Sequence, residues 1–128
     1  MNWLSLMAVF IGGGLGSLCR FMVSRMVVLF LYLGRFPLAT LLVNVLACSV
    51  MAVVLYFTFR EKAISEGWKL FWLVGFCGGF STFSTFSYEN WVLYREGYYF
   101  VLALNMVLSV AICFGLFLVA GKYLIAAE

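Results

Sequence analysis

Residues 75–88 read Gly-Phe-Cys-Gly-Gly-Phe-Ser-Thr-Phe-Ser-Thr-Phe-Ser-Tyr, and this stretch decides both the fold class and where function is sought. It lies within Leu70–Tyr88, which has no charged residue and is long enough to cross a bilayer. Leu, Ile and Val normally fill a membrane helix, but here a glycine pair precedes interleaved phenylalanines and hydroxyls. Hydroxyls in hydrocarbon are costly unless they are hydrogen-bonded, so this cluster indicates a lined pathway or a buried interface.

The composition is that of an integral membrane protein. Of the 128 residues, 66% are hydrophobic and 10% are charged, whereas soluble domains are about 45–50% apolar and about 25% charged. The apolar runs are continuous, which predicts an all-α membrane protein rather than the alternating pattern of a membrane barrel. We expect a single transmembrane domain, 1–128, with four helices over approximately 3–33, 36–59, 70–94 and 97–121.

Lys and Arg divide almost evenly between the two predicted faces of the membrane. One face would hold Arg60, Lys62, Lys69 and Lys122, and the other Arg25, Arg35 and Arg95. Since this bias sets orientation, the near-tie is compatible with insertion both ways and with an antiparallel homodimer. Four helices leave little room for an internal pore, so we expect an oligomer. The net charge of +3 is scattered and predicts no nucleic-acid partner.

The sequence shows no pattern typical of an enzyme or of a side-chain metal site. The cysteines lie one in each span without a CxxC pair, and the chain has no histidine. They are expected to be small apolar fillers: Cys19, Cys48, Cys77 and Cys113. No nucleophile–base pair is visible, so catalysis is not expected.

Small residues in the first span predict close helix packing. Gly12 and Gly16, like Gly13 and Ser17, are spaced i, i+4 on one face, which lets another helix approach. Arg20 follows one turn later. Its guanidinium can extend to the headgroups, hold a broken helix in place or attract anions to a vestibule, and the sequence leaves these open.

Polar residues also occur at helical spacing in the second and fourth spans. Thr40 and Asn44 are one turn apart. The Asn44 carboxamide can join two helices or donate to a partly dehydrated anion. Asn105, Ser109 and Cys113 share a face of the fourth span, which can form a pore wall or contact a partner.

The third span combines a weak point with two kinds of side chain. Gly78-Gly79 is the most breakable point, and a break would free carbonyls that need an ion, a side chain or water. Phe80, Phe83 and Phe86 recur every third residue, with hydroxyls between them, which predicts parallel stripes. Because phenyl edges are positive, edges beside hydroxyl donors would attract a small anion without the tight binding of a full charge.

Three motifs together resemble the Fluc (CrcB-type) fluoride channels. They are Gly-Gly-Gly-Leu-Gly-Ser-Leu-Cys-Arg (12–20), Pro-Leu-Ala-Thr-Leu-Leu-Val-Asn (37–44) and Gly-Phe-Cys-Gly-Gly-Phe-Ser-Thr-Phe-Ser-Thr-Phe-Ser (75–87), and the resemblance covers essentially the whole chain. It implies an antiparallel, dual-topology homodimer with a broken third helix and two narrow pores. Such a channel lies in the bacterial inner membrane as a multi-pass protein and lets cytoplasmic fluoride leave passively.

The resemblance also implies roles for particular residues. Phe83 and Phe86 would line the fluoride path with their ring edges, beside pore polar groups at Thr40, Asn44, Ser84, Thr85 and Ser109. Arg20 resembles the vestibule arginine of the family. A structural sodium ion would be held at the dimer centre by the backbone carbonyls of Gly78 and Ser81.

A small proton-coupled multidrug exporter is the alternative, because such exporters are also four-helix, dual-topology dimers of about this length. They need a membrane-buried carboxylate, typically in the first span. The first span here has none, and only Glu89 comes near, where we expect it at the interface rather than in the pathway.

Overall fold

The computed structural model describes residues 2–31, 34–60 and 64–125, and all regular structure within these ranges is helical. The helices are α1 (Trp3–Phe30), α2 (Leu38–Arg60), α3 (Glu66–Lys69), the π-helix η1 (Leu70–Phe76), α4 (Cys77–Phe80), α5 (Phe83–Arg95) and α6 (Tyr99–Ile125). Four stretches of the described chain are long and apolar enough to cross a membrane: α1, α2, the segment from α3 to α5, and α6. The chain is therefore a multi-pass membrane protein.

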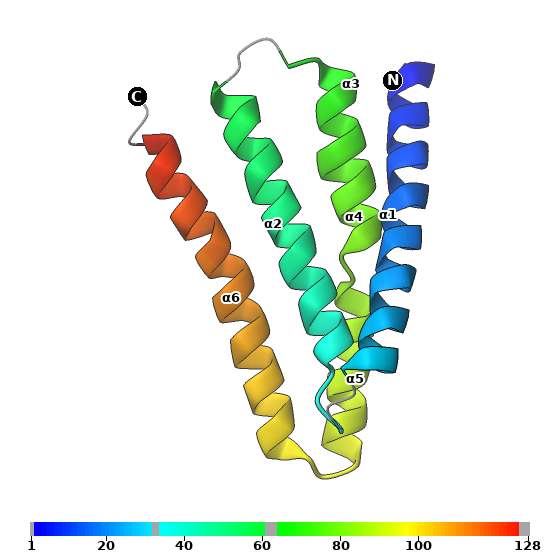
Figure 1. Cartoon of the computed structure of the whole chain (residues 1–128), viewed down its shortest axis with the longest axis vertical. Helices are drawn as coiled ribbons and strands as arrows, with labels where there is room; N and C mark the ends of the chain where they lie inside the picture. Colours follow the sequence, from blue (N-terminus) through cyan, green and yellow to red (C-terminus); the bar gives the residue numbers. More distant parts are fainter. Residues whose placement is uncertain (1, 32–33, 61–63, 126–128) are drawn as a thin grey trace.

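The helices run side by side, with α2 between α6 and the pair formed by α1 and the third span (Figure 1). Both termini lie at the end of the molecule that carries the α2–α3 connection, and the α5–α6 turn lies at the other end. That turn contains Gly97 with a φ of 82°, and Gly34 before α2 has a φ of 61°. Glycine adopts these left-handed conformations without a steric cost. The basic residue Lys62 lies outside the described residues.

The predicted glycine contacts in the first span are confirmed. Gly16 is buried against the third span, and a Cβ added there would lie only 2.9 Å from the Phe80 nitrogen. A Cβ on Gly79 would lie 3.0 Å from the Gly13 Cα. Ser17 donates to the Gly79 carbonyl over 3.4 Å. Backbone therefore meets backbone here, which only small residues allow.

A small apolar core lies where α1, α2 and α4 meet. Val43, Ala47 and Phe80 are buried in it, and Cys19 and Phe76 pack against it. Many large apolar side chains elsewhere are exposed, as expected where a membrane helix faces lipid or a partner, although Val27, Leu41 and Leu93 are buried. The α1–α4 side of the bundle is therefore the well-packed part of the single chain.

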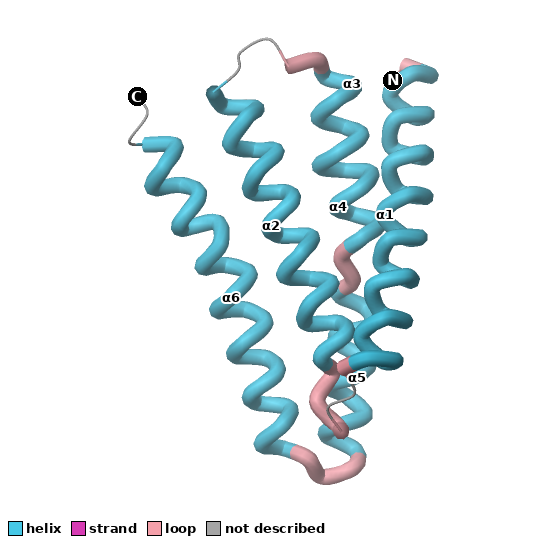
Figure 2. The backbone as a smooth tube through the Cα atoms, in the orientation of Figure 1, coloured by secondary structure: helices cyan, strands magenta, loops and turns pink. Residues whose placement is uncertain are grey.

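Two extended residues separate α4 from α5, as the loop segment between these helices in Figure 2 shows. Ser81 has φ −72° and ψ 158°, and Thr82 has φ −150° and ψ 107°. Gly78 and Gly79, expected to be the most breakable point, are both helical in α4, and the extended residues begin at Ser81, two residues after this pair. Gly79 instead lets the third span approach α1 closely, because it has no side chain at the contact.

The third span is also widened before α4. In η1 the backbone ladder skips one residue more than in an α-helix, and it ends with the Cys77 N–H donating to the Trp72 carbonyl. Aromatic rings follow one another along this helix, with centroids 5.5 Å apart for Trp68–Trp72, 5.1 Å for Trp72–Phe76 and 5.5 Å for Phe76–Phe80. This aromatic row leads from the start of the third span to the core.

Candidate functional site

The side chain of Asn44 on α2 pairs with the extended peptide of Thr82. The Thr82 N–H donates to Asn44 Oδ1 over 2.8 Å, and Asn44 Nδ2 donates back to the Thr82 carbonyl over 3.4 Å. An extended residue between two helices loses its ladder partners, so a side chain must replace them at membrane depth. Asn44 does so and retains a second Nδ2 proton, because the amide nitrogen carries two.

Thr82 is also the N-cap of α5 and the centre of a hydroxyl cluster. Its Oγ1 accepts from the Thr85 N–H over 3.3 Å, which is the usual capping bond. The same oxygen donates to Thr85 Oγ1 over 2.9 Å and lies 3.4 Å from Ser84 Oγ. The Thr82 proton is therefore used, and the Ser84 proton can be given to Thr82. The Thr85 proton has no such acceptor in this cluster.

The predicted phenylalanine stripe divides into two parts. Phe83 and Phe86 lie on the first turn of α5 with ring centroids 5.8 Å apart and planes inclined by 35°. Phe83 is 79% exposed in the single chain. Phe80 is instead buried in the α1–α2–α4 core. The continuous stripe is wrong because the extended residues after Phe80 end the helical periodicity on which it depended.

Thr40 and Glu89 form a contact that the sequence did not suggest. Thr40 on α2 is buried and donates to Glu89 Oε1 on α5 over 2.8 Å. The other carboxylate oxygen, Oε2, is buried without a hydrogen-bond partner among the described residues. Glu89 lines a cavity of about 430 Å³. The carboxylate expected at the interface therefore reaches a predicted pathway residue.

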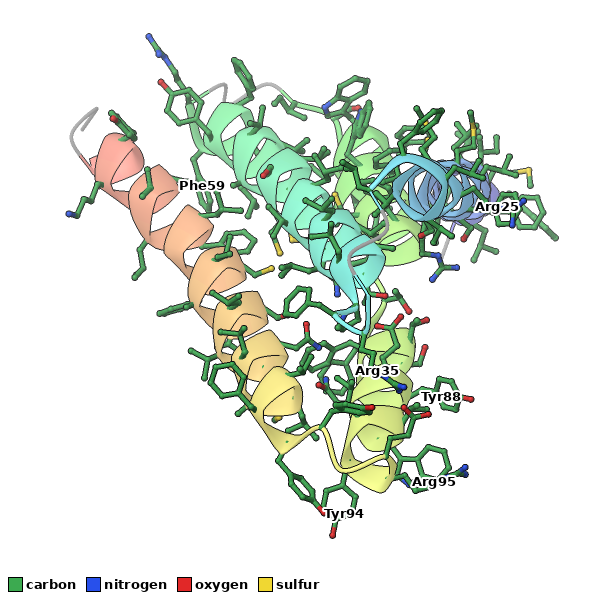
Figure 3. All side chains as sticks on the ribbon, turned by 60° about the horizontal axis from the view of Figure 1, so that its bottom comes forward. Arg25, Arg35, Phe59, Tyr88, Tyr94 and Arg95 are labelled. Atoms are coloured by element: carbon green, nitrogen blue, oxygen red, sulfur yellow. The ribbon has the colours of Figure 1, made fainter. Side chains whose placement is uncertain are left out.

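Charged side chains stand at the mouth of this cavity. Arg35 forms an ion pair with Glu96, with 2.5 Å between Nη1 and Oε2, and its guanidinium lies 4.2 Å from the centroid of the Tyr98 ring. In Figure 3, Arg35 lies beside α5 at the end of the molecule that also carries Tyr94. The positive charge of Arg35 is neutralised locally, and apart from this ion pair and Glu89 the cavity is lined mainly by apolar side chains.

The predicted residues of the fourth span meet α5. Asn105 Nδ2 donates to Asn90 Oδ1 over 3.1 Å, and Ser109 Oγ donates to Asn105 Oδ1 over 3.4 Å. Asn90 in turn donates to the carbonyl of Phe86 over 2.9 Å. We call Asn90, Asn105 and Ser109 the carboxamide bridge. Asn90 was not singled out from the sequence, because helical spacing relates it only to residues on its own helix and not to Asn105 on α6.

The remaining predicted site residues stand apart from these contacts. Arg20 is half-buried on α1, one turn after Gly16, and none of the side-chain hydrogen bonds within the described ranges joins it to another predicted site residue. Gly78 lies within α4, and Ser81 follows directly after its last residue. The Thr82 N–H, which would bond the Gly78 carbonyl in a continuous α-helix, goes to Asn44 instead.

Comparison with known proteins places these residues in one family. The model of the family described as "CrcB-like protein, Camphor Resistance (CrcB)" matches residues 7–122, which include every predicted site residue. This chain belongs to the CrcB-like family. Curated CrcB-like relatives named "Fluoride-specific ion channel FluC" include one from Pyrococcus abyssi, 41% identical over 112 residues, or 88% of this chain and 89% of the relative. Another from Coxiella burnetii is 37% identical over 123 residues, or 94% of each chain.

Proposed function

We propose that this protein is a fluoride-selective channel that lets cytoplasmic fluoride leave the cell passively. The observation that carries the proposal is its membership in a family with several relatives named fluoride-specific ion channels. The structure supports it with phenylalanine rings, hydroxyl donors and a carboxamide gathered at one helix start. Conduction of this kind is transport down a gradient and needs no catalytic residue.

The proposed path uses groups that suit a small anion. Phe83 and Phe86 would offer positive ring edges, and Thr85 and Asn44 keep protons that no neighbour uses. Ser84 would complete the polar lining, and Thr40 and Ser109 would lie beside it with their protons given to Glu89 and Asn105. Arg20 would raise the local concentration of anions at a vestibule. Without a fixed cation in the path, fluoride would bind weakly enough to leave again.

An antiparallel homodimer with two pores is the assembly we propose. The single chain exposes the Phe83 ring almost fully, so a second copy is needed to enclose a pore. The near-even division of Lys and Arg supports insertion in both orientations. The membrane would be the inner membrane of a bacterium, and residues 1–128 would act as one transmembrane domain, broken in its third helix at Ser81 and Thr82.

A structural sodium ion at the dimer centre also fits the residues present. Backbone carbonyls are hard oxygen donors, and the Gly78 and Ser81 carbonyls accept no backbone hydrogen bond across the α4–α5 junction. Sodium would supply positive charge there and hold two junctions together. The Gly78 and Ser81 carbonyls would bind it, and the extended conformation of Ser81 is what frees them from the helix ladder.

The proposed function is tested by purified protein in liposomes. Fluoride-loaded vesicles should release fluoride when an ionophore carries the compensating cation, and chloride-loaded vesicles should retain chloride. Asn44→Ala and Phe83→Ile should slow the release. A well-folded preparation that passes no fluoride would overturn the proposal. The multidrug exporter is not favoured, because the curated relatives are named fluoride-specific ion channels.

Orientation is tested separately with a cysteine placed near the C-terminus. A Lys122→Cys protein in sealed vesicles should react with a membrane-impermeant thiol reagent in about half of its copies, because both orientations are inserted. Labelling of all copies or of none would contradict the dual topology while leaving fluoride conduction intact.

A further inference from the structure

Helix α5 carries the proposed phenylalanine pair but has little apolar contact to hold it. Only Asn90 and Leu93 of its residues are buried. Rotation of a helix about its own axis is normally fixed by a packed apolar face, and within the single chain Leu93 is the one apolar residue that α5 buries. The buried polar contact of Asn90 therefore bears on the rotation of α5 more than it would in a well-packed helix.

Asn90 links α6 to the helical turn that carries Phe86. Its Oδ1 accepts from Asn105, which is 1% exposed, and its Nδ2 donates to the Phe86 carbonyl. One rigid carboxamide thus joins the fourth span to the turn that holds Phe86. Buried amides with directional bonds resist displacement, because breaking one bond leaves polar atoms without a partner.

The polar groups of the carboxamide bridge find hydrogen-bond partners within the protein rather than in the proposed pathway. Ser109 directs its proton to Asn105 Oδ1, and the Asn105 carboxamide both accepts and donates. These groups therefore act on each other in this conformation. These bonds join α6 to α5 of the same chain, which is neither of the two alternatives left open for the fourth span, a pore wall or contact with a partner.

We infer that Asn90 is a positioning residue for the phenylalanine pair. By tying the Phe86 turn to Asn105, it fixes the angle at which α5 presents the Phe86 ring, and so the discrimination between fluoride and larger halides. This inference rests on the proposed channel function. Loss of the tie lets α5 rotate, which widens or misdirects the ring-edge lining while the α1–α4 side of the fold is unaffected.

The test compares Asn90→Leu with wild type in the same liposomes. The variant should elute like wild type on size exclusion, yet its fluoride-to-chloride permeability ratio, taken from reversal potentials, should fall by about tenfold or more. The matched control is Ser49→Ala, which removes the bond from Ser49 Oγ to the Val45 carbonyl on α2 and should leave the ratio unchanged. A merely structural role would lower the yield without changing the ratio.

The outcomes separate the inference from the proposed function. Wild type that passes no fluoride overturns both. An active wild type with an unchanged ratio in folded Asn90→Leu overturns only the positioning role.

A second measurement uses the wild type, so it does not depend on the variant folding. The asparagines of the chain are Asn2, Asn44, Asn90 and Asn105, which makes selective ¹⁵N labelling informative. In lipid nanodiscs, the side-chain amides of Asn90 and Asn105 should exchange with deuterium about tenfold more slowly than that of the exposed Asn2. Exchange as fast as Asn2 would overturn the inference.

Discussion

Where η1 and α4 meet α1, backbone lies against backbone, whereas α5 is held by side-chain hydrogen bonds from α2 and α6. The first contact depends on the shape of glycine and uses almost no directional bonding. The second depends on a few carboxamides and hydroxyls around a helix with little buried apolar surface. One half of the third span is therefore held by packing, and the other by a few polar contacts.

The largest effect is expected from disrupting the close packing of α1 against η1 and α4. Gly16→Val places a branched side chain where a Cβ alone would lie 2.9 Å from backbone. Overpacking of this kind costs about 1–3 kcal/mol and more against unyielding backbone, so most of the protein should fail to elute as a folded species. The control is Gly14→Val on the same helix, since a Cβ there meets nothing within 4 Å. Equal loss in both variants would contradict the close contact.

A smaller loss is expected from the junction between the halves. Asn44→Ala leaves the Thr82 N–H without its acceptor, and a buried unsatisfied group costs about 1–3 kcal/mol. The free energy of unfolding, measured by denaturant titration in detergent, should fall by that amount, and fluoride release should nearly stop. Thr58→Ala, which removes only a bond to the Val54 carbonyl, is the control. An Asn44→Ala protein as stable as this control would show that the Thr82 pairing is unimportant.

The role of the polar contacts around α5 is tested by removing one hydroxyl group. Thr85→Val keeps the shape of the side chain but removes the hydroxyl proton that its neighbours leave unused. A hydrogen bond to a charged partner contributes about 1.5–3 kcal/mol, so fluoride efflux should slow about tenfold or more. The Thr82 hydroxyl loses Thr85 Oγ1 as its acceptor but can donate to Ser84 Oγ instead. Ser87→Ala, at an exposed hydroxyl of the same helix, should behave like wild type. A normal rate for Thr85→Val would remove Thr85 from the path.

The smallest effect is expected from the Arg35–Glu96 ion pair beside the cavity that Glu89 lines. Arg35 and Glu96 are both largely exposed, and exposed pairs contribute at most about 1 kcal/mol. Arg35→Ala should lower the thermal midpoint by only a few degrees at low salt, and the difference should shrink at high salt because salt screens the pair. A large, salt-independent loss would show that the arginine acts through packing on Tyr98 instead.

Long apolar runs and the glycine pattern were enough to predict the helical membrane class and the contact of α1 with the third span. They could not locate the junction, because the conformational freedom of Gly78 and Gly79 draws attention away from Ser81 and Thr82. Asn44, which supplies the hydrogen bonds that an extended Thr82 would otherwise lack, lies on another helix. A tertiary contact of this kind leaves no local signal.

The predicted site shows the same limit. Phe83, Phe86 and the hydroxyls between them are recognisable by type and spacing, and they do gather at the start of α5. Asn90 was not singled out, and Glu89 was expected at the interface, because each makes its contact with one residue on a different helix, Asn105 or Thr40. Spacing rules describe neighbours on one helix, so contacts between helices emerge only when the helices are packed.

The π-helical turn η1 has a consequence for length variation in this family. A π-turn holds one residue more than an α-helix needs, so deletion of one residue there would let the ladder close as an ordinary α-helix. The side chains on the two sides of the deletion would then keep their relative facing, because the widened turn already absorbs the extra residue. A gap of one residue in 70–76, in an alignment with a relative, therefore leaves Trp68 and the α4–α5 junction facing as they do here.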